Sequence, residues 1–70
     1  MYGLFRFTYD YHQFQRLECV SRSVEALEAR YEQLRNEQRY LFPLIDADRH
    51  DEFWGMEEAH YCILPVEEVQ

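Results

Sequence analysis

The sequence predicts a small α+β fold, with a three-stranded antiparallel sheet and one main helix packed on one face. Two observations predict it. A strand-like segment ends at Val20, just before serines, and a helical repeat of apolar residues begins at Val24. After the helix, a further strand-like segment occupies residues 59–66. Alternation favours strands, and spacings of three and four favour a helix, so the predicted order is strand, strand, helix, strand. We expect residues 1–70 to form a single domain.

The first strand is predicted over residues 1–8. One set of alternating side chains contains Tyr2, Leu4, Arg6 and Thr8, and the other contains Gly3, Phe5, Phe7 and Tyr9. Neighbouring side chains of a strand point to opposite faces of the sheet. The face that carries Phe5, Phe7 and Tyr9 is the more apolar one. We therefore expect this face to cover the core.

The second strand is predicted over residues 16–20, and residues 9–15 form a hairpin connection into which both strands can extend. The connection contains neither glycine nor proline and is rich in aromatic and polar side chains. It is too short for a crossover, which indicates that the two strands are antiparallel.

The main helix is predicted to begin at Val24 and to end near Glu37 or Arg39. Ser23 is the expected N-cap, because a serine hydroxyl accepts a hydrogen bond from a free N–H of the first turn. One apolar stripe recurs at spacings of three and four, at Val24, Leu27, Tyr31 and Leu34. This stripe is expected to face the sheet, and the charged residues between its members to face solvent.

The middle of the chain is harder to assign. Residues 40–45 are apolar, but Pro43 prevents the helix from continuing through them, so we expect an extended segment over the core. Residues 46–52 form a charged loop or the start of a short helix. Gly55 marks a turn or the end of that helix.

The last strand is predicted over residues 59–66, where Ile63 and Leu64 place an apolar side chain on each face. Pro65 has no N–H to donate. The strand therefore lies at an edge of the sheet, or Pro65 lies near its end.

Charge limits the classes of partner. The chain has 14 acidic residues and seven basic ones, all arginine, and a formal net charge of -7. Such a charge opposes direct binding to a phosphate backbone. It suits either plain solubility or attraction to a basic site on another protein. No apolar stretch approaches the length of a membrane span, so we expect no membrane association and a cytoplasmic location.

Candidate catalytic and metal-binding groups are few. His60 and Cys62 share one strand face, and Cys19 with His50 or His12 would be needed to complete a zinc site. The compact ligand pairs typical of such sites are missing, so we expect reduced thiols and no metal. A Cys–His nucleophilic pair has no obvious orienting residue. The carboxylates of residues 46–52 lack the pattern of an EF-hand. We predict no catalytic residue, no cofactor and no enzyme activity.

The order of segments resembles short, uncharacterised phage and prophage accessory proteins. The similarity is carried by the aromatic and acidic turn at 9–11, the strand end at 19–23, the helix at 25–31 and the C-terminal strand at 61–67. Phage proteins of this size often resemble accessory proteins that act against host defences. The resemblance therefore implies an inhibitor of a host defence protein, of the anti-CRISPR or anti-restriction type, working in the bacterial cytoplasm.

Aromatic and acidic residues form the predicted partner-binding site. Aromatic residues make up 17 % of the chain, and such rings anchor protein interfaces as well as cores. The predicted site comprises Tyr9, Asp10, Tyr11, Phe14, Asp46, Asp48, Asp51, Glu52, Phe53 and Trp54. The expected partner is a host protein that itself binds nucleic acid. Two alternatives stay open, a homo-oligomeric assembly protein and a protein that sequesters a nucleotide signal.

Overall fold

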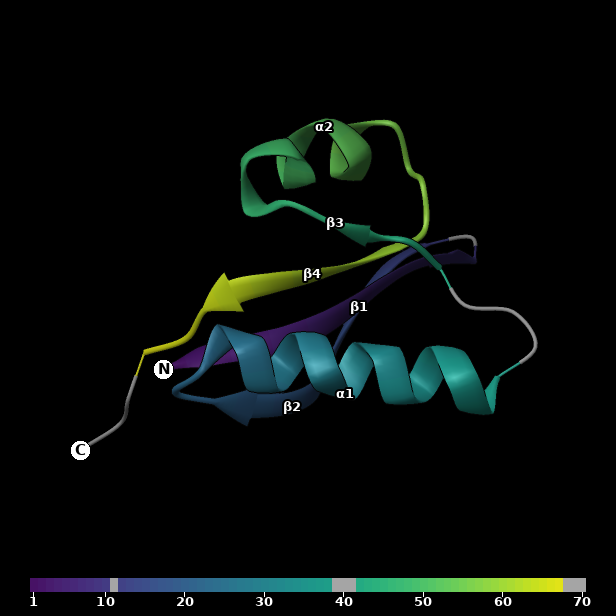
Figure 1. The fold of residues 1–70 in the computed structure, drawn as a ribbon. Helices are drawn as coiled ribbons and strands as arrows, with labels where there is room; N and C mark the ends of the chain where they lie inside the picture. Colours follow the sequence, from purple (N-terminus) through teal and green to yellow (C-terminus); the bar gives the residue numbers. More distant parts are fainter. Residues whose placement is uncertain (11, 39–41, 68–70) are drawn as a thin grey trace.

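The computed structural model describes residues 1–10, 12–38 and 42–67 of the chain, and it has an α+β fold (Figure 1). The elements follow in the order β1 (Tyr2–Asp10), β2 (His12–Ser21), α1 (Val24–Glu37), β3 (Leu44–Ile45), the 3-10 helix η1 (Ala47–Arg49), α2 (His50–Gly55) and β4 (His60–Pro65). The predicted α+β class is therefore confirmed.

The sheet has four strands in the order β2-β1-β4-β3. β1 pairs antiparallel with β2 and with β4, whereas β3 runs parallel to β4. The expected three-stranded antiparallel sheet is therefore wrong. β3 is only two residues long, too short to show an alternating pattern. The Pro43 carbonyl accepts a 2.8 Å hydrogen bond from the Tyr61 N–H and so joins this segment to β4.

The two strands of the hairpin extend into the predicted connection, as the prediction allowed. β1 and β2 stay paired up to Asp10 and His12, so most of the predicted connection at 9–15 is strand, and Tyr11 lies outside the described residues. Leu4 pairs with Cys19 but Phe5 pairs with Leu17, which leaves one extra residue in β2. Such a bulge increases the local twist of the strand pair.

α1 spans Val24–Glu37, within the predicted bounds, and covers one face of the sheet. The Ser23 hydroxyl accepts a 3.3 Å hydrogen bond from the Ala26 N–H, which confirms the predicted N-cap. Three members of the apolar stripe are buried against the strands. The resulting core contains Leu4, Leu27, Tyr31, Leu34 and Tyr61.

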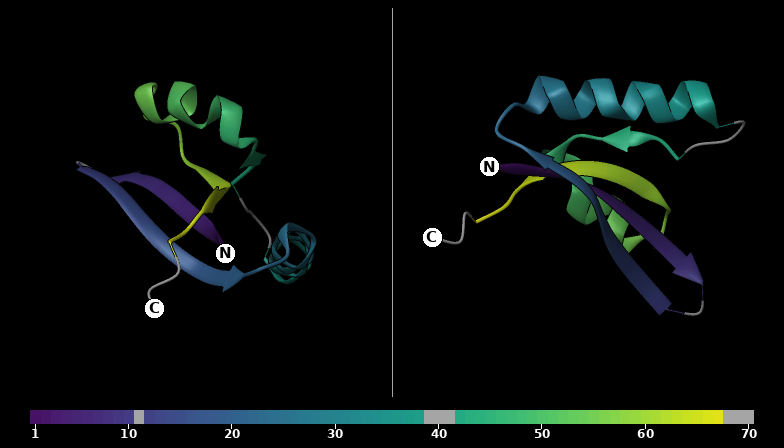
Figure 2. Two further views of the ribbon diagram at one scale, coloured as in Figure 1. Left: turned by 90° about the vertical axis from the view of Figure 1, so that its left-hand side faces the viewer. Right: turned by 90° about the horizontal axis from the view of Figure 1, so that it is seen from below.

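A second helix covers the opposite face. α1 and α2 lie on opposite sides of the sheet (Figure 2, left). Leu4 and Phe7 point to opposite faces of β1, and both are buried, with 0 % and 1 % of their surfaces exposed. The face of Phe5, Phe7 and Tyr9, which was expected to cover the core, is the one that α2 covers, and the core under α1 lies on the face of Leu4.

β4 runs between β1 and β3, and Pro65 is its last residue. The missing N–H is therefore accommodated at the end of the strand, one of the two places that were predicted. Within residues 1–10, 12–38 and 42–67, no helix combines the length and the apolar character that crossing a membrane requires.

Candidate functional site

The most distinctive surface is formed by residues 46–58, which we call the acidic lobe. It contains η1, α2 and the turn before β4. Six carboxylates and one arginine give this segment a formal charge of -5, out of -7 for the whole chain. All six acidic residues are exposed: Asp46, Asp48, Asp51, Glu52, Glu57 and Glu58. Like charges so close together repel one another, so something else must hold the lobe in place.

Trp54 attaches the lobe to the sheet. Its ring centroid lies 5.1 Å from that of Phe7, in an edge-to-face arrangement, and 5.3 Å from that of Tyr9. Its backbone carbonyl accepts hydrogen bonds from Gln13 Nε2 at 3.1 Å and from the Tyr9 hydroxyl at 3.5 Å. The side chain and the carbonyl of one residue thus link α2 to both strands of the hairpin. Burial and the nearby Glu57 charge raise the pKa of Tyr9, so its hydroxyl keeps its proton.

Two histidines form a second attachment. His60 is fully buried, and its Nδ1 lies 2.7 Å from the Glu58 carbonyl oxygen. A carbonyl only accepts, so Nδ1 of His60 donates to it. His50 Nδ1 lies 2.9 Å from His60 Nε2, so one of these two nitrogens donates to the other. Burial, and secondly the neighbouring His60, lower the pKa of His50, while Asp51 opposes the shift.

The end of α2 is held in a strained conformation. Glu58 donates its N–H to the Phe53 carbonyl at 3.1 Å, and Glu57 donates to the Trp54 carbonyl at 3.3 Å. These two bonds form a Schellman motif, which requires a left-handed residue where glycine is usual. Here that residue is Glu57, with a φ of 57°. Gly55 does end α2, as predicted, but it does not take the left-handed position.

The predicted site residues do not all gather on one surface. Asp46, Asp48, Asp51 and Glu52 lie together in the exposed lobe, where Phe53 and Trp54 are half-buried. Tyr9 points towards Trp54, whereas Phe14 pairs with Thr8 on the opposite face of the sheet. Asp10 ends β1, and Tyr11 lies outside the described residues. The role of these residues in partner binding stays a prediction.

The surroundings of the two cysteines give little support for a reactive thiol or a metal site. Burial, and secondly Asp46, raise the pKa of the Cys62 thiol to about 11, which keeps it protonated at neutral pH. Cys19 packs against the α1 core, on the face opposite to that of His60. Among the residues that the structure describes, no three histidine, cysteine or carboxylate side chains gather as metal ligands would.

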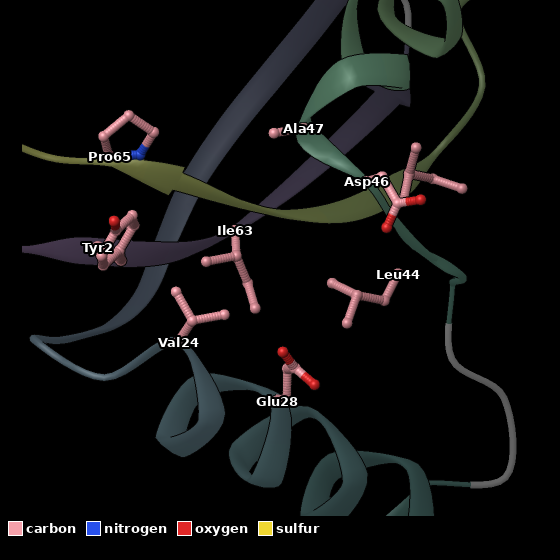
Figure 3. Close-up of a pocket in the computed structure, with 9 residues that line it drawn as sticks. Tyr2, Val24, Glu28, Leu44, Asp46, Ala47, Ile63 and Pro65 are labelled. Carbon is pink, nitrogen blue, oxygen red and sulfur yellow. The ribbon is translucent and has the colours of Figure 1, made fainter.

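A shallow hollow of about 340 Å³ lies between α1 and the segment of β3 and η1 (Figure 3). Its walls are mostly apolar and include Val24, Leu44 and Ile63. The carboxylates of Glu28 and Asp46 face it from opposite sides. Two carboxylates at one small site oppose the binding of a phosphate group in this hollow.

Sequence reasoning missed Glu57, Glu58 and the contact between His50 and His60. The two glutamates lie in the turn that follows α2, just before the strand that was predicted over residues 59–66. A run of acidic residues after Gly55 was the available signal. The histidine pair joins residues ten apart in the sequence, and no local pattern predicts such a contact.

No family model, no curated protein and no solved structure matches this chain.

Proposed function

We propose that the chain is a non-enzymatic protein-binding module whose acidic lobe docks onto a basic site of a partner. The observation that carries the proposal is the concentration of charge, with -5 of the formal charge of -7 in residues 46–58. A charge needed only for solubility has no reason to gather in one segment. A concentrated charge creates a directed field, which raises the rate of encounter with a surface of opposite sign.

The backbone at Glu57 supports the same proposal. A side chain in the left-handed region costs about 1–2 kcal/mol, and glycine would relieve that cost. The protein instead has a carboxylate there, beside Glu58 and on the same exposed turn. Strain of this kind gathers at functional sites. A contribution of the Glu57 carboxylate to partner binding would explain why this strained residue is not a glycine.

The partner class follows from charge and from the resemblance to phage accessory proteins. A protein that contacts nucleic-acid phosphates has a basic surface, and the six exposed carboxylates of the acidic lobe complement it. The proposed partner is a host defence protein that binds nucleic acid, and the proposed effect is inhibition by occupation of that basic site.

The test begins with immobilised chain exposed to a bacterial lysate, followed by elution with heparin, a polyanion that competes for basic sites. Association kinetics with the purified partner are then measured for Asp48→Asn/Asp51→Asn. We expect association to slow by about tenfold at low salt and its salt dependence to weaken, because steering depends on these charges. The dissociation rate and the melting temperature should change little.

A matched control places the same charge change on α1. Glu25→Gln/Glu32→Gln removes two exposed carboxylates from the opposite side of the sheet, and the partner should still associate at nearly the wild-type rate. Equal slowing by both pairs would mean that only net charge matters and would contradict the proposal. Glu57→Gly adds a further check, since it should raise stability by about 1 kcal/mol while slowing association.

A further inference from the structure

The outer edge of β2 is long and uncovered. β2 spans ten residues at the end of the sheet, and within the described residues no strand pairs with its outer side (Figure 2). The backbone N–H and C=O groups on such an edge can pair with another strand. The other edge differs, because β3 is only two residues long. Natural proteins usually protect a long edge with proline, several charges or a β-bulge. β2 has no proline and no lysine, and its bulge leaves Glu18 as the extra residue between Leu17 and Cys19.

β2 also exposes large apolar side chains. Phe14, Leu17 and Val20 have 50 %, 45 % and 47 % of their surfaces exposed. Leu17 and Val66 lie close over Gly3, where a Cβ would come within 2.8 Å and 2.9 Å of their side-chain carbons. Leu17, Val66 and Gly3 therefore form an apolar area beside the edge. This area lies on the same face of the sheet as α2, but outside the part that α2 covers. Exposed apolar groups next to a free strand edge favour burial against another chain.

The charges of β2 are self-complementary. The strand contains one arginine and one glutamate, Arg16 and Glu18, on either side of Leu17. Both charged side chains lie on the α1 side of the sheet, where Glu18 Oε1 is 3.6 Å from Arg6 Nε and 3.9 Å from Arg16 Nε. An antiparallel copy of β2 related by a two-fold axis at Leu17 would place each Arg16 opposite the Glu18 of the other copy. The strand is formally neutral, unlike the acidic lobe.

We propose that β2 pairs antiparallel with β2 of a second copy, about a two-fold axis that passes beside Leu17 and perpendicular to the sheet. The occupant of the free edge is therefore this same chain. Such an isologous contact joins two four-stranded sheets into one of eight strands. A perpendicular two-fold axis preserves the faces of the sheet, so both acidic lobes lie on the same side. The dimer presents two lobes together and can bind a partner at two points.

The test is the mass in solution, measured by sedimentation over a range of concentrations from micromolar to submillimolar. The wild-type chain should approach twice the monomer mass as its concentration rises. Arg16→Glu or Glu18→Arg alone places like charges across the axis and should raise the dimer dissociation constant by about tenfold or more. The double variant Arg16→Glu/Glu18→Arg restores opposite charges and should recover most of the affinity.

The matched controls are Arg35→Glu and Glu32→Arg on α1, which make the same charge changes in another exposed ion pair, with an N–O distance of 3.7 Å. They should leave the dissociation constant unchanged. Circular dichroism of each variant separates loss of pairing from loss of folding. A wild-type chain that stays monomeric throughout would overturn the proposal. So would a dimer that the β2 reversals affect no more than the α1 reversals, because another face would then form the contact.

Discussion

The two faces of the sheet use different chemistry to hold a helix. On one face, the 14-residue α1 packs Leu27, Tyr31 and Leu34 onto Leu4 and the neighbouring strands. On the other face, the six-residue α2 is held by Trp54 and by a hydrogen-bonded histidine pair. One contact is mainly apolar and extends along a full helix. The other depends on a few rings and hydrogen bonds at one end of the sheet.

This difference teaches how a short chain can present a concentrated charge. A helix of six residues is far too short to be stable alone. In addition, carboxylates within α2 and just before it repel one another: Asp46, Asp48, Asp51 and Glu52. The α1 face carries the apolar cluster of Leu4, Leu27, Tyr31, Leu34 and Tyr61, and the α2 face holds the acidic lobe. Changes on the first face should therefore affect the whole molecule, and changes on the second mainly the lobe.

The largest effect is expected for Leu27→Ala. Leu27 is 1 % exposed in the middle of the α1 contact, and its truncation should lower the free energy of unfolding by about 2–4 kcal/mol. Chemical denaturation measures this loss, which is a large part of the stability of so short a chain. Gln33→Ala, an exposed change on the same helix, is the control. A midpoint for Leu27→Ala close to that of the control would mean that the α1 face is not the main source of stability.

A smaller and more local effect is expected for Trp54→Ala. The indole is half-buried against Phe7 and Tyr9, so its removal should lower the free energy of unfolding by about 2 kcal/mol. We expect amide hydrogen exchange to accelerate in α2 and the following turn, while α1 stays protected. Equal acceleration in α1 and α2 would show that the two faces unfold as one unit and would remove the distinction between them.

The smallest effect concerns pH. The folded state lowers the pKa of His50, mainly through burial, so the unfolded chain binds more protons once the pH falls below the ordinary histidine value of about 6.5. Stability should therefore decrease as the pH falls from about 7 towards 5.5, before most carboxylates titrate. Unfolding curves at several pH values measure this slope.

His50→Asn should flatten that slope, since it removes the group that titrates. His12→Asn changes an exposed histidine of β2 and should leave the slope as it is. If both variants keep the wild-type slope, the histidine pair does not make the α2 face sensitive to pH.

Much of the α1 face was predictable from sequence. The stripe of Leu27, Tyr31 and Leu34 and the Ser23 N-cap are local patterns, because helix geometry places residues three and four apart on one side. The acidic residues at 46–52 were also recognised, together with a short helix as one of two options. The arrangement of the α2 face was not, since it depends on contacts between residues far apart, such as Trp54 with Gln13.

By itself, the sequence determined the α+β class, the bounds of α1 and the charge of the acidic lobe, because each follows from local spacing or from composition. Only the tertiary structure decided that the sheet has a fourth, parallel strand, that both faces of β1 are buried and that Glu57 takes a left-handed conformation. A two-residue strand is too short to have a period, and its pairing depends on where Pro43 meets Tyr61. These features arise from long-range packing, which local residue patterns do not encode.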